Sequence, residues 1–349
     1  MNMKLRSNKK EFVGWGCSKT YQLSMEKFLL DLIFLTDNNS FYWGTKINNT
    51  DVLKPNEFIQ NVKLKAYKII IFANSYNQIF TELEANNLKY KEDYFLYTDF
   101  SEFREVFYIS NLSRDYKFLD KIIRNSYRCL DIGANVGIFT LKMARLAGNE
   151  GKIFSFEPSP FPFKELKENI KRFRAENVNI NHFALVSDPK LKDIVFYIPV
   201  DEFGIARFGY GSLKQEFANF WIEDNCDKKD KFINCRVKTK TLDNFCEENN
   251  IHKIDFIKID TEGSEMDVVK GGEKIILKNL PLIQCEMSDD AFGSSVFKKL
   301  VDYMLELNFN RYVEINSCLK LVEGYKNYPG LKVNYFIHKQ NLKKYNYLF

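Results

Sequence analysis

The feature that most constrains this chain is an apolar run that ends in an acid and leads into two glycines four residues apart, Asp131-Ile132-Gly133-Ala134-Asn135-Val136-Gly137. A second acid, Glu157, closes the next apolar run. In an open α/β sheet, this order places a carboxylate and a tight backbone turn at the carboxyl end of one strand. It places a carboxylate able to bind a ribose diol at the end of the neighbouring strand. The sequence therefore predicts a nucleoside site at that edge of a Rossmann-like sheet.

The same segment indicates which nucleoside to expect. Glycines let the main chain approach a ligand closely, where a Cβ would obstruct it. Asn135 and Ile138 stand where a GxGxxG dinucleotide pattern requires its second and third glycines, and Asp131 would repel a pyrophosphate. A cationic ligand suits an acidic edge better, and S-adenosylmethionine is the common nucleoside of that charge. The candidate residues for binding it are Asp131, Gly133, Asn135, Gly137 and Glu157.

Length and composition bound the class of protein. A chain of 349 residues exceeds what one hydrophobic core usually organises, so two domains are expected. The apolar share of 45% and charged share of 28% are typical of a soluble globular protein. The net charge of +5 is spread over interspersed residues and favours no nucleic-acid partner. The seven cysteines lack CxxC spacing, and the first twelve residues are unlike a secretory signal. The apolar run Phe28 to Leu35 is too short to span a membrane. We therefore expect a cytoplasmic setting.

Strand-like and helical segments alternate along the chain, which predicts parallel sheets in two α/β domains. Residues 1–104 form the smaller domain and residues 105–349 the larger one, which carries a loop-rich insert at about 201–234. The smaller domain has expected strands near 12–14, 32–35 and 68–73 and a helix near 76–87. In the larger domain we expect strands at 127–132, 152–157, 178–183, 194–198, 254–260, 282–286, 311–315 and 331–337, and helices from 137, at 163–173, at 242–248, after 264 and at 294–307.

The smaller domain carries a partial version of the nucleotide-binding pattern. The turn at Gly14 to Ser18 is followed by Asp37, about 20 residues past the turn as in a dinucleotide fingerprint. Lys19, however, occupies the third glycine position. The favoured interpretation is a Rossmann-like domain that binds no nucleotide tightly and could dock other enzymes; a working NAD site is the alternative.

A second cluster of acids follows a later buried strand, at the same expected edge of the sheet as the glycine turn. Alternation along a strand puts Lys258 and Asp260 on one face. Lys258, Asp260 and Glu262 are the candidate catalytic residues, and either acid could accept a substrate proton. Asp260 and Glu286, which ends the next strand, could also bind Mg²⁺ through oxygen. Glu265 is expected to cap the following helix instead.

Two further segments could complete a binding site. Ala184 and Leu185 follow the strand at 178–183 and offer a small apolar floor for adenine. The insert holds aromatic residues among glycines and polar residues, which form either a lid that stacks on sugar rings or a small core under a long loop. These aromatic residues are Phe203, Phe208, Tyr210, Phe217, Phe220 and Trp221.

The stretch from Cys129 to about Ser288 resembles the FkbM family of S-adenosylmethionine-dependent methyltransferases, through DIGANVGIFT, FSFEPSP, FALVSD, TLDNF and DFIKIDTEGSEMDVVKGG. KIDTEGSE is the most specific of these segments. The resemblance covers somewhat under half of the chain. It implies a class I sheet of seven strands with the last one antiparallel, donor binding by the glycine turn and Glu157, and Asp260 and Glu262 facing the acceptor. The first hundred residues resemble, more weakly, degenerate sugar-nucleotide Rossmann modules fused to glycan-modifying enzymes.

The family resemblance implies O-methylation, often of sugar hydroxyls. We therefore expect a carbohydrate O-methyltransferase acting on a nucleotide sugar or a glycan during assembly of capsule or other surface polysaccharide. The alternatives are a catalytically inactive methyltransferase-fold scaffold and a nicotinamide-dependent oxidoreductase that uses Asp37. Methylation of nucleic-acid amino groups is disfavoured, because Asp260-Thr261-Glu262 stands where such enzymes carry Asn or Asp before Pro-Pro and an aromatic residue. An acidic rim would also repel phosphates.

Overall fold

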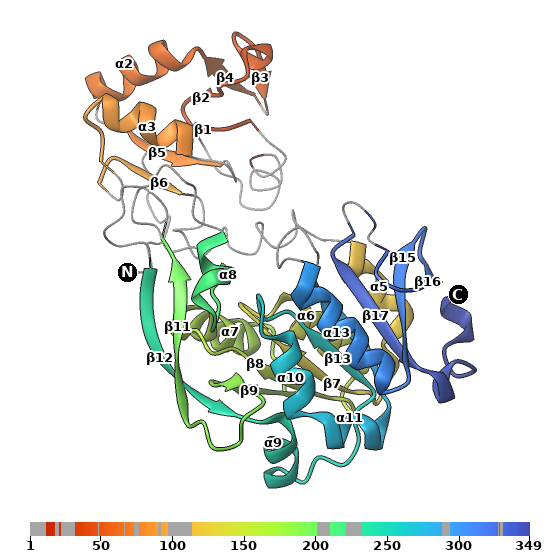
Figure 1. The fold of residues 1–349 in the computed structure, drawn as a ribbon. Coiled ribbons are helices and arrows are strands. Elements are labelled where there is room, and N and C mark those ends of the chain that lie inside the picture. Colours follow the sequence, from red (N-terminus) through yellow and green to blue (C-terminus); the bar gives the residue numbers. More distant parts are fainter. Residues whose placement is uncertain are drawn as a thin grey trace. The chain divides into compact units, whose positions relative to one another are not determined.

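The chain divides into two compact units, Met1–Ser113 and Arg114–Phe349 (Figure 1). The expected boundary near residue 105 falls among residues outside the described part of the chain and stays a prediction. No helix among the described residues is both long and apolar enough to cross a membrane. The structure, a computed structural model, describes residues 12–17, 21, 32–47, 49–65, 67–72, 77–89, 92–96, 114–200, 210–220, 232–287, 294–326, 328 and 331–349.

The first unit contains a six-stranded sheet in the order β3-β4-β2-β1-β5-β6. Only the β3–β4 pair in this sheet is antiparallel; the other four pairs are parallel, as the alternating pattern predicted. The described elements are β1 (Phe12–Trp15), β2 (Leu35–Thr36), η1 (Ser40–Tyr42), β3 (Lys46–Ile47), β4 (Thr50–Leu53), α2 (Pro55–Lys65), β5 (Lys68–Ile71), α3 (Asn77–Ala85) and β6 (Tyr94–Leu96).

The second unit is built on an eight-stranded sheet in the order β16-β15-β17-β14-β13-β7-β8-β9. Strand β17 runs antiparallel to both of its neighbours, β14 and β15. The sheet of seven strands with a reversed last strand is thus present, and β16 adds an eighth strand at the edge, beyond the prediction. The strands are β7 (Arg128–Ile132), β8 (Lys152–Phe156), β9 (Val178–Asn181), β13 (Phe256–Ile259), β14 (Leu282–Glu286), β15 (Phe309–Ile315), β16 (Cys318–Leu321) and β17 (Val333–His338).

Helices cover both faces of this sheet because its central strands are apolar on both sides. Along β7, Cys129 packs with residues of α5 and α6, whereas Leu130 packs in a separate cluster with residues of α9, α10, α11 and α13. The helices are α5 (Arg114–Ile122), α6 (Ile138–Ala147), α7 (Pro160–Arg172), α9 (Leu242–Glu248), α10 (Glu265–Gly271), α11 (Glu273–Asn279) and α13 (Ser294–Glu306), with short 3₁₀ turns η4 (Lys339–Asn341) and η5 (Asn346–Leu348).

Helix α7 begins earlier than the sequence predicted. Three prolines led us to expect a helix only from Phe163, but the helix starts at Pro160. A proline has no N–H to lose in the first turn, and its fixed φ suits that position. Pro160 and Pro162 therefore open the helix and shorten the loop after β8.

A second, smaller sheet accompanies the insert. Its three strands, β10 (Ala184–Leu185), β11 (Asp193–Pro199) and β12 (Phe232–Lys240), lie in the order β10-β12-β11. Strand β11 pairs antiparallel with β12 along the whole length of β11, from Asp193 opposite Lys238 to Pro199 opposite Phe232. The insert also contains α8 (Gln215–Phe220). The structure therefore replaces part of the expected loop with regular elements.

Strand register brings the predicted site segments to one edge. Ile132 pairs with Phe156 on one side and with Ile259 on the other, so the chain leaves β7, β8 and β13 at the same level. Gly133, Glu157 and Asp260 are the next residues of the three strands. This shared exit positions the site described next.

Candidate active site

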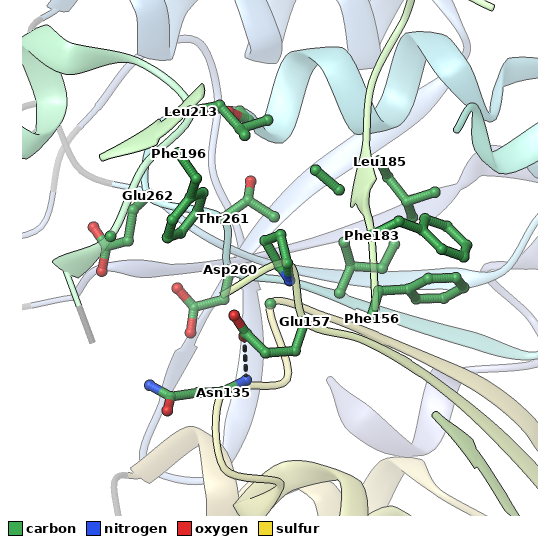
Figure 2. Close-up of a pocket in the computed structure, with 16 residues that line it drawn as sticks. Asn135, Phe156, Glu157, Phe183, Leu185, Phe196, Leu213, Asp260, Thr261 and Glu262 are labelled. Carbon is green, nitrogen blue, oxygen red and sulfur yellow. Dashed lines mark hydrogen bonds between the residues drawn. The ribbon is translucent and has the colours of Figure 1, made fainter. Parts of the chain in front are cut away.

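A pocket opens where β7, β8 and β13 end (Figure 2). The space within it and at its open mouth totals about 610 Å³, open solvent included. Most predicted site residues line it; Asp131, Gly137, Lys258 and Glu286 do not. The lining residues are Ile132, Gly133, Asn135, Phe156, Glu157, Pro158, Phe183, Ala184, Leu185, Phe196, Gly211, Leu213, Asp260, Thr261, Glu262 and Ser264.

Gly133 joins the three strand ends. Its φ is +79°, a left-handed conformation that favours glycine. Its N–H donates to the carbonyl oxygen of Phe156 at 3.0 Å, and a Cβ at this position would overlap the main-chain oxygen of Asp260. Only glycine therefore fits this turn, which keeps the pocket floor formed by main chain.

Gly137 acts one step further from the pocket. It precedes α6 with a φ of +92°, and a Cβ there would overlap the Leu166 side chain of α7. Gly137 is not among the residues that line the pocket, and its contact with a ligand stays a prediction. Its role in the structure is to let the two helices pack closely.

Glu157 is the acid that reaches the pocket from the end of β8. It is only 5% exposed. One carboxylate oxygen accepts the N–H of Asn135 at 2.8 Å (Figure 2). The other accepts the N–H of Ser159 at 2.8 Å. Burial raises its pKa to about 7, against the opposing effect of these two main-chain donors. Each oxygen keeps a further acceptor position, so the carboxylate is suited to a pair of hydroxyl donors.

An apolar wall stands beside Glu157. Ala184 and Leu185 of β10 are buried and line the pocket, as predicted for an adenine floor. Phe156 and Phe183 line it as well, with their rings edge to face at 5.6 Å between centroids. A flat apolar ring would find small side chains and aromatic edges here.

Asp131 does not line the pocket, and its binding of the ligand stays a prediction. Its side chain is 0% exposed and accepts a hydrogen bond from Thr140 Oγ1 at 2.5 Å. Thr140 also bonds Ser155, at 2.9 Å between the hydroxyl oxygens. Burial raises the pKa of Asp131, while Lys258 and Thr140 act to lower it. The sequence marked the acid correctly as a strand-end feature, but Thr140 on α6 holds it inside.

Lys258 is likewise buried, at 3% exposed, and does not touch the pocket. It pairs with Asp131 across the β7–β13 ladder, and its Nζ lies 3.8 Å from Asp131 Oδ1 and 3.0 Å from Asp260 Oδ2. The ring of Phe139 packs against the ammonium, with Nζ 4.7 Å from the ring centroid. Although burial alone lowers the pKa of Lys258, the two carboxylates raise it, so the ammonium stays charged. This lysine connects the buried acid to the pocket acid.

Asp260 and Glu262 line the side of the pocket formed by the end of β13. The Asp260 side chain is 28% exposed and is held by Lys258. Burial, together with the charges of Asp260 and Glu286, raises the pKa of Glu262 to about 9. The raised pKa favours the protonated form of Glu262, which can donate a hydrogen bond, while Asp260 presents acceptor oxygens.

Glu265 was expected to cap the helix that follows it, but its side chain accepts hydrogen bonds from the loop that precedes this helix. One of its carboxylate oxygens accepts the N–H of Thr261 and the N–H of Gly263, both at 3.1 Å, and the Thr261 hydroxyl at 3.0 Å. With three donors on one oxygen, Glu265 fixes the loop that carries Glu262. The backbone of Glu262 is left-handed, with a φ of +50°, a conformation that costs free energy in a non-glycine residue.

The insert holds this loop from the other side. Ser212 Oγ donates to the carbonyl oxygen of Glu262 at 2.7 Å, and Lys214 Nζ donates to that of Gly263 at 2.8 Å. Phe217 of α8 packs so closely on Gly263 that a Cβ there would overlap its ring. Of the insert aromatics, Phe217 therefore fits the interpretation as a small core.

Several pocket residues went unnoticed in the sequence. Phe196 of β11 and the insert residues Gly211 and Leu213 come from segments remote in the chain, and no local pattern marks them. Of the other insert aromatics, Tyr210 is 36% exposed. Phe203, Phe208 and Trp221 lie outside the described residues, as does the Phe220 side chain.

The structure gives no support to a magnesium site. Glu286 ends β14 outside the pocket lining. In the part of the chain that the structure describes, no group of three or more His, Cys, Asp and Glu side chains could hold a metal ion. Asp260 is held by Lys258, which competes for the oxygen that a cation would need.

The parallel sheet with a reversed strand, and the pocket at its carboxyl edge with an acid after the second strand, define a Rossmann-like α/β protein. A family model described as the methyltransferase FkbM domain matches residues 131–311, more than half of the chain. The chain belongs to this family of methyltransferases.

The chain is also similar to individual proteins and solved structures. The chain is 31% identical over 202 residues to 2-O-methyltransferase NoeI from Sinorhizobium fredii, covering 55% of this chain and 78% of NoeI. It is 24% identical over 252 residues to AMB antimetabolite synthetase AmbE from Pseudomonas aeruginosa, covering 65% of this chain but only 12% of AmbE. Among solved structures, it resembles the methyltransferase FkbM from Methylobacillus flagellatus KT, with a TM-score of 0.36 and 12% identity over 94% of this chain and 90% of that one.

Proposed function

We propose that this methyltransferase transfers a methyl group from S-adenosylmethionine to a hydroxyl oxygen of a carbohydrate. The observation that carries the proposal is Glu157, a buried acid at the end of the second strand with both oxygens fixed by main-chain N–H groups inside a pocket. An acid in that place binds the ribose diol of a nucleoside.

The pocket fits the rest of this donor. Gly133 leaves main chain where a side chain would fill the floor, and Ala184 and Leu185 leave room for adenine beside Phe183. When bound, S-adenosylmethionine would supply an electrophilic methyl group on a sulfonium. The acids that line the pocket favour a positive charge of this kind.

The chain's own residues provide for the acceptor. Asp260 is proposed to accept the proton of the attacking hydroxyl, because it lines the pocket and is partly exposed. Lys258 acts as a positioning residue that fixes the Asp260 carboxylate from behind. Glu262, in the protonated form that its raised pKa favours, would donate a hydrogen bond to a substrate oxygen. Alignment of the two reactants in one enclosed site supplies much of the rate.

The proposed class of acceptor rests on the name of one relative and on the kinds of side chain that line the pocket. NoeI is by name a 2-O-methyltransferase, which supports transfer to oxygen. Sugars fit a pocket that combines carboxyl groups with aromatic side chains such as Phe196, since these bind hydroxyls and ring faces. We propose an acceptor in surface-polysaccharide assembly such as capsule, handled in the cytoplasm, with the first unit able to dock other glycan-assembly enzymes.

Calorimetry tests the donor site. Wild-type protein should bind S-adenosylmethionine, and Glu157→Gln should weaken binding about 10- to 100-fold, the loss expected when hydrogen bonds to a charged group are weakened. Glu168→Gln, an exposed acid on α7, is the matched control and should bind like wild type. Equal affinity of the Glu157→Gln protein would refute the site.

Labelled methyl transfer tests the activity. Wild-type protein incubated with labelled donor and cell-envelope glycans should label a methyl ether, and Asp260→Asn should lower the turnover number by about 10²-fold or more, as expected for loss of a general base. A protein that binds the donor but labels no nucleotide sugar, lipid-linked glycan or polymer would instead be the inactive scaffold.

A further inference from the structure

The turn that follows β7 in the second unit is repeated after β1 in the first. Gly16 follows β1 with a φ of +110°, and its N–H donates to the carbonyl oxygen of Thr36, the last residue of β2, at 2.8 Å. Gly133 follows β7 with a φ of +79° and donates to Phe156, the last residue of β8, at 3.0 Å. Both pairs of strands are parallel neighbours.

The acids that come next repeat as well. Asp37 directly follows Thr36; its Oδ2 accepts the N–H of Cys17 at 2.6 Å and its Oδ1 accepts the N–H of Asn39 at 2.8 Å. This is the arrangement of Glu157, whose two oxygens accept one N–H from the turn after the first strand and one from the residue two positions on. The two units thus present a carboxylate in the same hydrogen-bonded frame.

We propose that the first unit holds a second nucleoside site, in which Asp37 binds the 2′ and 3′ hydroxyls of a ribose. Strand β1 lies between β2 and β5, so the strand order reverses at β1, and ligands of open α/β sheets bind at the carboxyl ends beside such a reversal. Each Asp37 oxygen has one main-chain donor and an acceptor position left for a hydroxyl. A negative carboxylate in this place selects an unsubstituted diol against a 2′-phosphate.

The surroundings of Asp37 are open to a ligand. The carboxylate is half-buried, and Asn38 and Asn39 beside it are exposed. Phe41, in the short helix that follows, is 79% exposed and offers an aromatic face on which a base could stack. Trp43 Nε1 donates to the carbonyl oxygen of Asp37 at 2.7 Å, which fixes the segment. The ligand class is a ribonucleoside, free or phosphorylated, including one in a nucleotide sugar.

Titration of the full-length protein with ADP, GDP and UDP tests this site. S-adenosylhomocysteine is added first at saturation, so that the pocket of the second unit is filled. We expect at least one diphosphate to bind with a Kd of about 1 mM or tighter. Its 2′-deoxy and 3′-deoxy forms should each bind about tenfold more weakly, because each loses one hydrogen bond to a carboxylate. If S-adenosylhomocysteine fills both sites, two molecules bind per protein chain, and only one binds per chain of the Asp37→Asn variant.

Two variants separate this site from the donor site. Asp37→Asn should weaken nucleotide binding and leave S-adenosylhomocysteine binding in the second unit unchanged, whereas Glu157→Gln should weaken S-adenosylhomocysteine binding and leave nucleotide binding unchanged. Asp51→Asn on β4, an exposed acid of the same unit, is the matched control and should bind as wild type. Absence of binding by all three diphosphates, with a donor stoichiometry of one that Asp37→Asn leaves unchanged, would overturn the proposal. Equal affinity for the ribose and deoxyribose forms would also overturn the proposal. This comparison uses only wild-type protein, so it does not depend on the folding of a variant.

Discussion

Glu157 in the second unit and Asp37 in the first occupy equivalent positions at the ends of paired parallel strands. Their surroundings differ. Glu157 is 5% exposed, borders a pocket, and has a pKa raised by burial to about 7. Asp37 is half-buried, next to exposed asparagines. The comparison shows that the pairing of two parallel strands is enough to position and orient the acid that follows the second strand. The pocket comes from what is added around it, the β10-β12-β11 sheet and the loop at Glu262.

The largest effect should come from the turn glycine. Gly133→Ala places a Cβ against the main-chain oxygen of Asp260 and also imposes a left-handed φ on alanine, so we expect a loss of about 3–5 kcal/mol in the free energy of unfolding. Gly44→Ala in the first unit meets the φ cost alone, because nothing lies within 4 Å of its Cβ position. It should cost about 1–2 kcal/mol. Urea unfolding followed by circular dichroism measures both, and similar losses would show that the strand ends are not tightly joined.

The second largest effect should come from removing a buried charge beside the site of the second unit. Lys258→Met leaves Asp131 buried without its cation and should destabilise the protein by about 3 kcal/mol. Adding Asp131→Asn should recover more than half of that loss. In the first unit, Lys46→Met breaks an ion pair of side chains 62% and 61% exposed and should cost less than about 1 kcal/mol. A Lys258→Met loss as small as that of Lys46→Met would show that the buried pair is not needed.

A smaller effect follows from the pKa of Glu157. Because that pKa is raised to about 7, the carboxyl group is largely protonated at pH 6 and ionised at pH 8. The ionised form accepts stronger hydrogen bonds from a diol, so affinity for S-adenosylmethionine should rise several-fold, about 3- to 10-fold, across that range. Calorimetry at both pH values measures the change. Glu157→Gln, which cannot ionise, should bind with equal affinity at both, and a pH dependence that persists in this variant assigns the effect to another group.

The smallest effect tests the layer added by the insert. Lys214→Met removes one hydrogen bond to the carbonyl oxygen of Gly263 and a partly exposed ion pair with Asp267. We expect KM for the acceptor to rise about two- to fivefold, with kcat little changed, the equivalent of about 0.5–1 kcal/mol. Lys192→Met, an exposed lysine near the start of β11, is the control. A kcat that falls while KM stays constant would mean that Lys214 acts on the reacting groups.

The strand-end acids and glycines were predictable because they depend on local order. An apolar run, an acid and a glycine turn specify a strand and its exit, so the sequence alone suffices to place Gly133, Asn135, Glu157 and Asp260 at one edge of the sheet. Ala184 and Leu185 were predicted from their small apolar side chains after the strand expected at 178–183, and the reversed strand β17 was implied by the family resemblance.

The positions of Asp131 and Lys258 were not predictable in the same way. Which face a strand residue occupies depends on register between β7 and β13, which are over a hundred residues apart in sequence. The pairing of β11 with β12 spans the whole insert, and so no local pattern marked the contribution of Phe196 to the pocket. The hydrogen bonds to the Asp37 carboxylate were also not predictable. The sequence pattern shows that the third glycine is missing, but it does not show which main-chain groups the carboxylate binds.

The placement of β17 between β14 and β15 has a consequence for biosynthesis. The ribosome makes β14 and β15 first, but neither can be joined to the other until Val333–His338 has emerged from the exit tunnel. Until then the nascent chain presents the open edge of β14, whose unpaired main-chain groups invite pairing with another chain. A message cut short before that point would yield an aggregation-prone protein, even though every residue of the pocket had already been translated.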